Sequence, residues 1–186
     1  TTLKSFYDAV VPAMETLKKE GKILNWGIGP GQEEAVCDVI NSTTPPDAIQ
    51  CGVNVLNSLG AIGYASIKPN PKLVLEESKK KDIPILAIRA VQAGALTSKM
   101  DREPHPSGFD HPDFADYEKA QPFRELAEDW GESPASLAHR YALSIDKVGS
   151  VILGIKNRQE LIECLEAEKK GRLDIEQILT LENLFN

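Results

Sequence analysis

Short apolar runs alternate with amphipathic stretches along the whole chain, and this alternation constrains the fold more than any other feature. Four apolar runs predict strands at residues 23–28, 48–54, 85–90 and 148–155. Apolar residues at helical spacing predict helices at residues 3–20, 32–41, 71–81, 123–130, 134–144, 158–169 and 174–185. Strands separated by helices pair in parallel through right-handed crossovers, so we expect one α/β domain over residues 1–186. A doubly wound sheet can stop at four strands, whereas a closed α/β barrel needs eight.

One long segment follows neither pattern. Residues 101–121 are polar, rich in Pro and Asp, and without periodicity, which predicts a surface flap. The flap and its end hold five potential metal ligands, His105, Asp110, His111, Asp113 and Asp116. Their spacing matches no zinc or calcium pattern, so we predict no metal site there.

Charge and cysteine content narrow the class of protein. The net charge of −7 argues against nucleic acid or an anionic membrane as the main partner. No apolar run approaches the ~20 residues that a membrane span needs. The three cysteines, Cys37, Cys51 and Cys164, are few, odd in number and widely spaced, and no histidine lies close to one of them in the sequence. They predict free thiols in a reducing compartment, and hence a cytoplasmic protein.

The segment from Ser150 to Cys164 carries the most specific chemical signal. An apolar run ends at Gly154, Lys156 and Asn157 follow, and an amphipathic helix begins at once. A cation beside the free N–H groups of a helix N-terminus is a common way to hold a phosphate in α/β proteins. The alternative is that Lys156 is an ordinary exposed lysine after a strand.

This corner and four preceding segments resemble, in the same order, the second half of the aldo-keto reductases. Residues 133–144, for example, resemble the family's Thr-Pro-Ala-Gln-Leu-Ala-Leu-Arg-Trp-Leu-Leu-Ser helix; the other matching segments are 20–29, 47–57 and 85–98. The resemblance implies parallel strands alternating with helices, as the second half of a (β/α)₈ TIM barrel. It also implies an NAD(P)(H)-dependent oxidoreductase that transfers a hydride between nicotinamide and the carbonyl of a small aldehyde or ketone substrate.

The resemblance further implies that this chain supplies most of the cofactor cradle. Gln50 matches a residue that binds the nicotinamide carboxamide, and Glu163 matches one that contacts adenine. The pyrophosphate would be wrapped by the loop of Gly94, Leu96 and Ser98, mainly through backbone groups. The adenosine 2′-phosphate would be held by Gly154, Lys156 and Asn157, which implies NADP as the cofactor.

The chain departs from the family pattern at several of these places. Glu160 stands where the family commonly has Arg or Gln, and an acid there would repel a 2′-phosphate, so NAD stays open. Cys164 replaces an Asn that contacts adenine, and Gly29-Pro30 replaces a Ser-Asn pair.

Two further residues of the chain have ordinary structural interpretations. Arg89 is expected in a salt bridge to a nearby carboxylate rather than as an anion-binding residue, and His139 is expected to be a hydrogen-bonded structural histidine.

The family's catalytic Asp, Tyr, Lys and His sit on the first four strands of its barrel, and no segment here matches them. We therefore predict no catalytic residue in this chain and expect the chain alone to be inactive, since Tyr is the family's general acid. A missing N-terminal half or a completing chain would supply the catalytic groups and cover the open strands. Two alternatives are a non-catalytic regulatory or binding protein on the same scaffold, and a stand-alone four-stranded α/β domain with its own helices over the inner strand faces.

Overall fold

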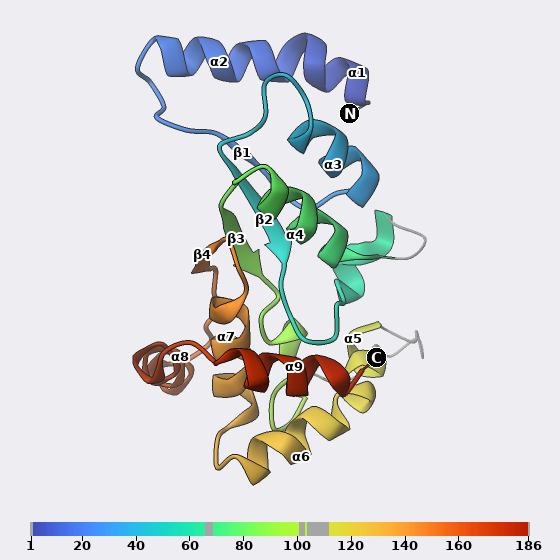
Figure 1. Cartoon of the computed structure of the whole chain (residues 1–186), viewed down its shortest axis with the longest axis vertical. Helices are drawn as coiled ribbons and strands as arrows, with labels where there is room; N and C mark the ends of the chain where they lie inside the picture. The colour runs from blue at the N-terminus through green and yellow to red at the C-terminus, as the bar shows by residue number, and fades with distance from the viewer. Residues whose placement is uncertain (1, 66–68, 101–102, 104–111, 186) are drawn as a thin grey trace.

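The structure, a computed structural model, describes residues 2–65, 69–100, 103 and 112–185. Its single parallel sheet contains β1 (Gly27–Ile28), β2 (Ala48–Gly52), β3 (Ile85–Ile88) and β4 (Val148–Val151), which lie side by side in sequence order (Figure 1). A doubly wound sheet would reverse its order at a switch point, and these four strands do not. The predicted parallel strands alternating with helices are therefore confirmed.

Helices connect the successive strands and extend the chain at both ends. They are α1 (Leu3–Ser5), η1 (Phe6–Val10), α2 (Val11–Lys19), α3 (Glu33–Ile40), η2 (Gly60–Ala65), α4 (Pro71–Lys80), η3 (Gln92–Gly94), α5 (Pro112–Lys119), α6 (Gln121–Asp129), α7 (Pro134–Ser144), α8 (Arg158–Lys170) and α9 (Ile175–Asn183). Polar side chains cap the N-termini of α7 and α9. Ser133 accepts a hydrogen bond from the backbone N–H of Ser136, and Asp174 forms a capping box with Gln177.

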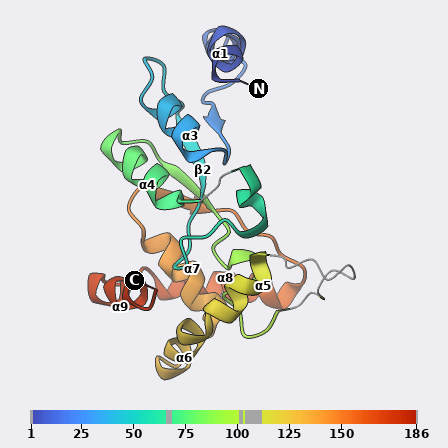
Figure 2. The ribbon, with the colours of Figure 1, turned by 90° about the vertical axis from the view of Figure 1, so that its right-hand side faces the viewer.

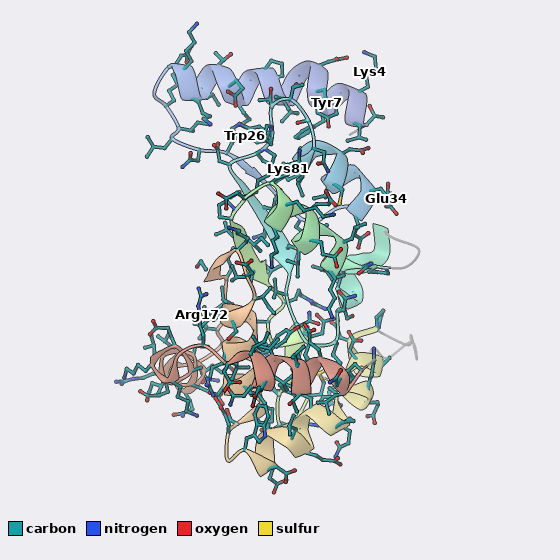
Figure 3. All side chains as sticks on the ribbon, viewed as in Figure 1. Lys4, Tyr7, Trp26, Glu34, Lys81 and Arg172 are labelled. Atoms are coloured by element: carbon teal, nitrogen blue, oxygen red, sulfur yellow. The ribbon has the colours of Figure 1, made fainter. Side chains whose placement is uncertain are left out.

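The first predicted helix forms, but with a change of hydrogen-bond register in its middle. Pro12 has no N–H to donate, so the regular ladder cannot run through it. The backbone before it adopts π-helical geometry, in which the N–H of Val11 bonds to the carbonyl of Phe6, five residues earlier. Trp26 lies below this helix in Figure 3, and its indole N–H donates to Glu15 of α2 at 2.7 Å.

Two predicted strands are shorter than expected. The run at residues 23–28 pairs only over Gly27–Ile28, and Leu24 is 86% exposed. The run at residues 148–155 ends at Val151, after which the chain leaves the sheet and exposes Ile152, Leu153 and Ile155. Both runs are apolar, but each lies at an edge of the four strands, where only one neighbour is available for pairing.

The prediction of an irregular flap over residues 101–121 is wrong for its second part. Residues 112–119 form α5, and α6 already begins at Gln121. The polar composition concealed this helix because one of its acids, Asp113, points inward and is only 1% exposed. Residues 101–102 and 104–111, with His105, Asp110 and His111, lie outside the described residues.

The sheet has one covered face and one open face. Helices α3 and α4 lie on the same side of the strands (Figure 2), and a core cluster joins Val36 and Val74 of these helices to Ile49 and Ile85 of the sheet. The alternate residue Leu86 points to the other face and is 37% exposed. Among the described residues, the helices leave Leu86 on the inner face partly in water, which argues against the stand-alone domain.

A second core cluster lies beyond the strand ends and supports the loops there. Leu96, Phe123, Leu137 and Leu181 are completely buried in it, and they come from the loop after β3 and from α6, α7 and α9. Helix α7 contributes residues to this cluster and also packs against the sheet. The cluster therefore supports the carboxyl ends of the strands.

Adjacent residues of β3 provide a test of the two faces. Ile85→Ala should lower the free energy of unfolding by about 2–5 kcal/mol, because it leaves a cavity in the closed core. Leu86→Ala should cost less than half as much, since its side chain is already partly in water. Urea unfolding of the two variants measures the difference, and equal losses would mean that the inner face is covered.

Candidate functional site

A cleft of about 640 Å³ lies at the carboxyl ends of β3 and β4. One wall is the segment after β3, and the other consists of the segment after β4 together with α7 and α8. The lining residues are Arg89, Ala90, Val91, Ala93, Gly94, Thr97, Ser98, Lys99, Ala135, His139, Ile152, Leu153, Gly154, Ile155, Lys156, Glu160, Glu163 and Cys164. Parallel strands bring these distant segments to the same edge of the sheet, where α/β proteins bind ligands.

The wall after β3 has an unusual backbone. Arg89, Gln92 and Ala93 have φ values of 60°, 44° and 52°, in the left-handed region that residues other than glycine seldom adopt. Gly94, with φ of 97°, follows them without such a penalty. Left-handed residues of this kind persist where surrounding interactions hold them in place.

A buried polar network holds this backbone. The guanidinium of Arg89 forms an ion pair with Asp113 of α5, and its Nε donates to the side-chain oxygen of Gln92 at 3.0 Å. Gln92 is completely buried, and its amide donates to Asp116 at 2.6 Å and to Ser58 at 3.0 Å. The expected salt bridge of Arg89 is thus confirmed, and it fastens the cleft wall to α5.

Hydrogen bonds within the loop occupy backbone groups that were expected to bind the cofactor. The N–H groups of Gly94 and Leu96 both donate to the carbonyl of Val91, at 3.0 and 3.1 Å. The side chain of Leu96 is buried in the second core cluster. Ser98, by contrast, is exposed at the cleft, as is Lys99. Ser98 and Lys99 are therefore the exposed polar side chains that line this wall.

The opposite wall is the corner that leads into α8. Asn157 is the N-cap of α8, and its side-chain oxygen accepts from the N–H of Glu160 at 3.0 Å. The carboxylate of Glu160 in turn accepts from the backbone N–H of Lys156 at 2.8 Å and from the Asn157 amide at 3.0 Å. Lys156 and Gly154 are exposed on the same wall.

A histidine and a cysteine meet at the base of the cleft. His139 of α7 is 7% exposed, and its Nε2 lies 3.2 Å from the Sγ of Cys164 in α8. Burial lowers the pKa of His139 against the opposing effect of Glu163, and burial also raises the pKa of the Cys164 thiol. The pair is therefore held in its neutral form and is not an activated nucleophile.

The structure brings together five of the eight residues expected to bind the cofactor. Gly94, Ser98, Gly154, Lys156 and Glu163 line the cleft. The other three lie elsewhere: Gln50 on the inner face of β2 opposite Leu86, Leu96 in the core, and Asn157 in the cap beside the cleft. Sequence reasoning missed the approach of His139 to Cys164, because 25 residues separate them. The expected hydrogen bonding of His139 is found only at Nε2, since Nδ1 has no partner among the described residues.

Comparison with known proteins places these features in a family. The model of the aldo/keto reductase family matches residues 2–185. The chain belongs to the aldo/keto reductase family. Among curated proteins, no sequence matches it.

Solved structures of aldo-keto reductases share the fold. The holo form of aldo-keto reductase AKR11C1 from Bacillus halodurans superposes with a TM-score of 0.74 and 19% identity over 99% of this chain and 58% of that one. Glycerol dehydrogenase AKR11B4 from Gluconobacter oxydans gives a TM-score of 0.64 and 22% identity over 91% of this chain and 51% of that one. The chain therefore spans a little more than half the length of these reductases.

Among the described residues, no three His, Cys, Asp or Glu side chains gather closely enough to hold a metal ion. Within the same part of the chain, no helix combines the length and apolar character that crossing a bilayer requires.

Removing the Asp113 carboxylate from the buried network should lower the free energy of unfolding. Asp113→Ala leaves the Arg89 guanidinium buried without its carboxylate and should lower the free energy of unfolding by about 3–5 kcal/mol. The control is Asp8→Ala, which breaks the exposed pair with Lys4 and should cost about 0–1 kcal/mol. Similar losses in urea unfolding would show that the network does not hold the wall.

The buried imidazole predicts a pH dependence of stability. Because the pKa of His139 is lower in the folded chain than its ordinary value of about 6.5, the unfolded chain binds more protons between the two values. Stability should therefore be complete above pH 7 and fall as the pH is lowered through 6. His139→Gln should flatten the unfolding free energy between pH 7 and pH 5, and an unchanged slope would contradict the assignment.

Proposed function

We propose that this chain forms the dinucleotide-binding part of an NAD(P)(H)-dependent aldo-keto reductase. A single observation carries the proposal: the loop after β3 and the corner before α8, both implied by the resemblance to hold the cofactor, line one cleft. The volume of about 640 Å³ lies within the range of small-molecule and cofactor sites. The substrate would be a small aldehyde or ketone.

The residues present fit such a ligand in shape and in charge. A Cβ added at Gly154 would meet no atom within 4 Å, so this stretch of wall is open to a ligand that lies against it. Lys99 and Lys156 stand on opposite walls and supply positive charge for a pyrophosphate, and the Ser98 hydroxyl can donate a hydrogen bond. Apolar surface at Ile152 and Leu153 can pack against a flat ring.

The role of these residues in the reaction is to bind and to orient. When bound, the nicotinamide supplies or accepts the hydride in carbonyl reduction or alcohol oxidation. The network of Arg89, Gln92 and Asp113 keeps the loop wall in place before the ligand arrives, so little ordering cost remains at binding. Gln50 lies on the open inner face of the sheet, where a barrel would enclose it, and there its amide can bind the carboxamide group.

Catalysis requires a completing half, which we propose as four further strand–helix units of aldo-keto reductase type, on the same polypeptide or on another chain. The molecule exposes 10,682 Å², whereas a folded chain of 20.4 kDa is expected to expose about 8,800 Å². The excess of roughly 1,900 Å² is as large as one partner's share of an obligate interface. Apolar side chains at the open β4 edge, including Ile152 and Ile155, belong to this surface.

Native mass spectrometry and an assay of carbonyl reduction test this part of the proposal. We expect the chain to assemble with a separately produced first half of an aldo-keto reductase. We also expect carbonyl reduction with a nicotinamide cofactor to appear only in that mixture. An assembled barrel without such activity would instead favour the non-catalytic binding protein, which the acid at Glu160 and the substitution at Gly29-Pro30 also suggest. A cytoplasmic location stays a prediction from the sequence.

Substitutions at two glycines test whether the dinucleotide binds in this cleft. Gly154→Val places a branched side chain on the cleft wall and should weaken NADH binding at least tenfold, while the free energy of unfolding stays within about 1 kcal/mol. Gly149→Val is the control, because a Cβ there also meets no atom within 4 Å, yet Gly149 does not line the cleft. Titration of NADH fluorescence measures both, and equal affinities would place the dinucleotide elsewhere.

A further inference from the structure

The carboxylate of Glu160 occupies the N-terminal corner of α8. One of its oxygens accepts from the backbone N–H of Lys156 at 2.8 Å, and the other accepts from the side-chain amide of Asn157 at 3.0 Å. Lys156 and Asn157 are two of the residues that the resemblance implies for holding a phosphate. The chain therefore carries its own anion at this place, covalently attached and always present.

Charge at this end of the cleft also disfavours a second anion. Glu163 lies one turn from Glu160 on the same wall, and Lys156 is the cation among the described residues that line this wall. Arg158 follows the cap, but it is not among the residues that line the cleft. A 2′-phosphate entering here would meet two carboxylates for one lysine, and it would have to displace Glu160 from two hydrogen bonds.

A ribose without the 2′-phosphate can form a hydrogen bond with Glu160. Each carboxylate oxygen can accept more than one hydrogen bond, and each oxygen of Glu160 accepts one in this corner, so the group keeps acceptor capacity beside the cleft. A ribose hydroxyl is a donor and can use that capacity, whereas a phosphate at neutral pH offers mainly acceptors. The same side chain thus attracts one ligand and repels the other, which is how specificity is commonly achieved.

We infer that Glu160 is a specificity-determining residue that makes this site select NAD(H) over NADP(H). This inference rests on the proposed function, because it assumes that a dinucleotide binds in the cleft. It favours NAD over the NADP that the resemblance to the family implies. It assigns the discrimination to one charge in one place, so it can be tested by removing that charge alone.

The test compares dissociation constants of NADH and NADPH, measured by cofactor fluorescence, for the full chain and two variants. The unaltered chain should bind NADH at least tenfold more tightly than NADPH. Glu160→Gln keeps an oxygen that can accept from Lys156 and remains a good residue for this helix position, so the fold should be retained. This variant should tighten NADPH binding roughly tenfold and change NADH binding less than threefold.

Glu166→Gln is the matched control. It removes the same charge from the same helix, at an exposed position where Glu166 pairs with Lys169. It should leave the ratio of the two dissociation constants unchanged. If both variants shift the ratio equally, or if the unaltered chain prefers NADPH, the inference is overturned while the proposed function stands. If neither dinucleotide binds to any of the three proteins, the proposed function fails and the inference fails with it.

Discussion

The parallel pairing of β2 with β3 is the interaction on which the rest of the molecule depends. Ile49 and Ile85 lie opposite each other across this pair and are completely buried beneath α3 and α4. Parallel strands can be joined only by long crossovers, and the handedness of these crossovers places the helices on one side. All four strands consequently end at one edge, which is why the segments after β3 and β4 become the two walls of a single cleft.

Buried polar contacts hold the cleft wall that follows β3. On the opposite wall, the carboxylate of Glu160 accepts hydrogen bonds at the start of α8. The left-handed conformations of Arg89, Gln92 and Ala93 each cost of order 1–3 kcal/mol. The ion pair to Asp113 and the hydrogen bonds of the buried Gln92 offset this cost. At the corner of α8, a carboxylate satisfies donors that would otherwise attract a phosphate. The first wall is therefore preorganised, and we infer that the second discriminates between ligands by charge.

The open inner face connects the fold to the proposed chemistry. Leu86 and Gln50 lie side by side there, an apolar and an amide side chain on a surface that the described helices do not cover. In a closed (β/α)₈ barrel, this face would be enclosed by the opposite strands, and the groups that act on a carbonyl would approach across it. The cleft lies at the carboxyl ends of the same strands, so the proposed function divides cofactor binding and catalysis between two halves of one barrel.

The sequence by itself determined the family and most elements of the fold, because these depend on local patterns. The alternation of strands and helices, and the caps at Ser133 and Asp174, need only residues a few positions apart. Five of the eight expected cofactor residues also line the cleft, since each follows a strand whose end the topology places at one edge.

Only the tertiary structure decided which groups remain able to bind. The N–H groups of Gly94 and Leu96 are used within their own loop, and α5 turned out to be the anchor of that loop through Asp113. The contact of His139 with Cys164 likewise needs α7 and α8 to pack together. Periodicity reports which face of an element is apolar, but hydrogen-bond partners and burial depend on contacts between segments far apart in the chain.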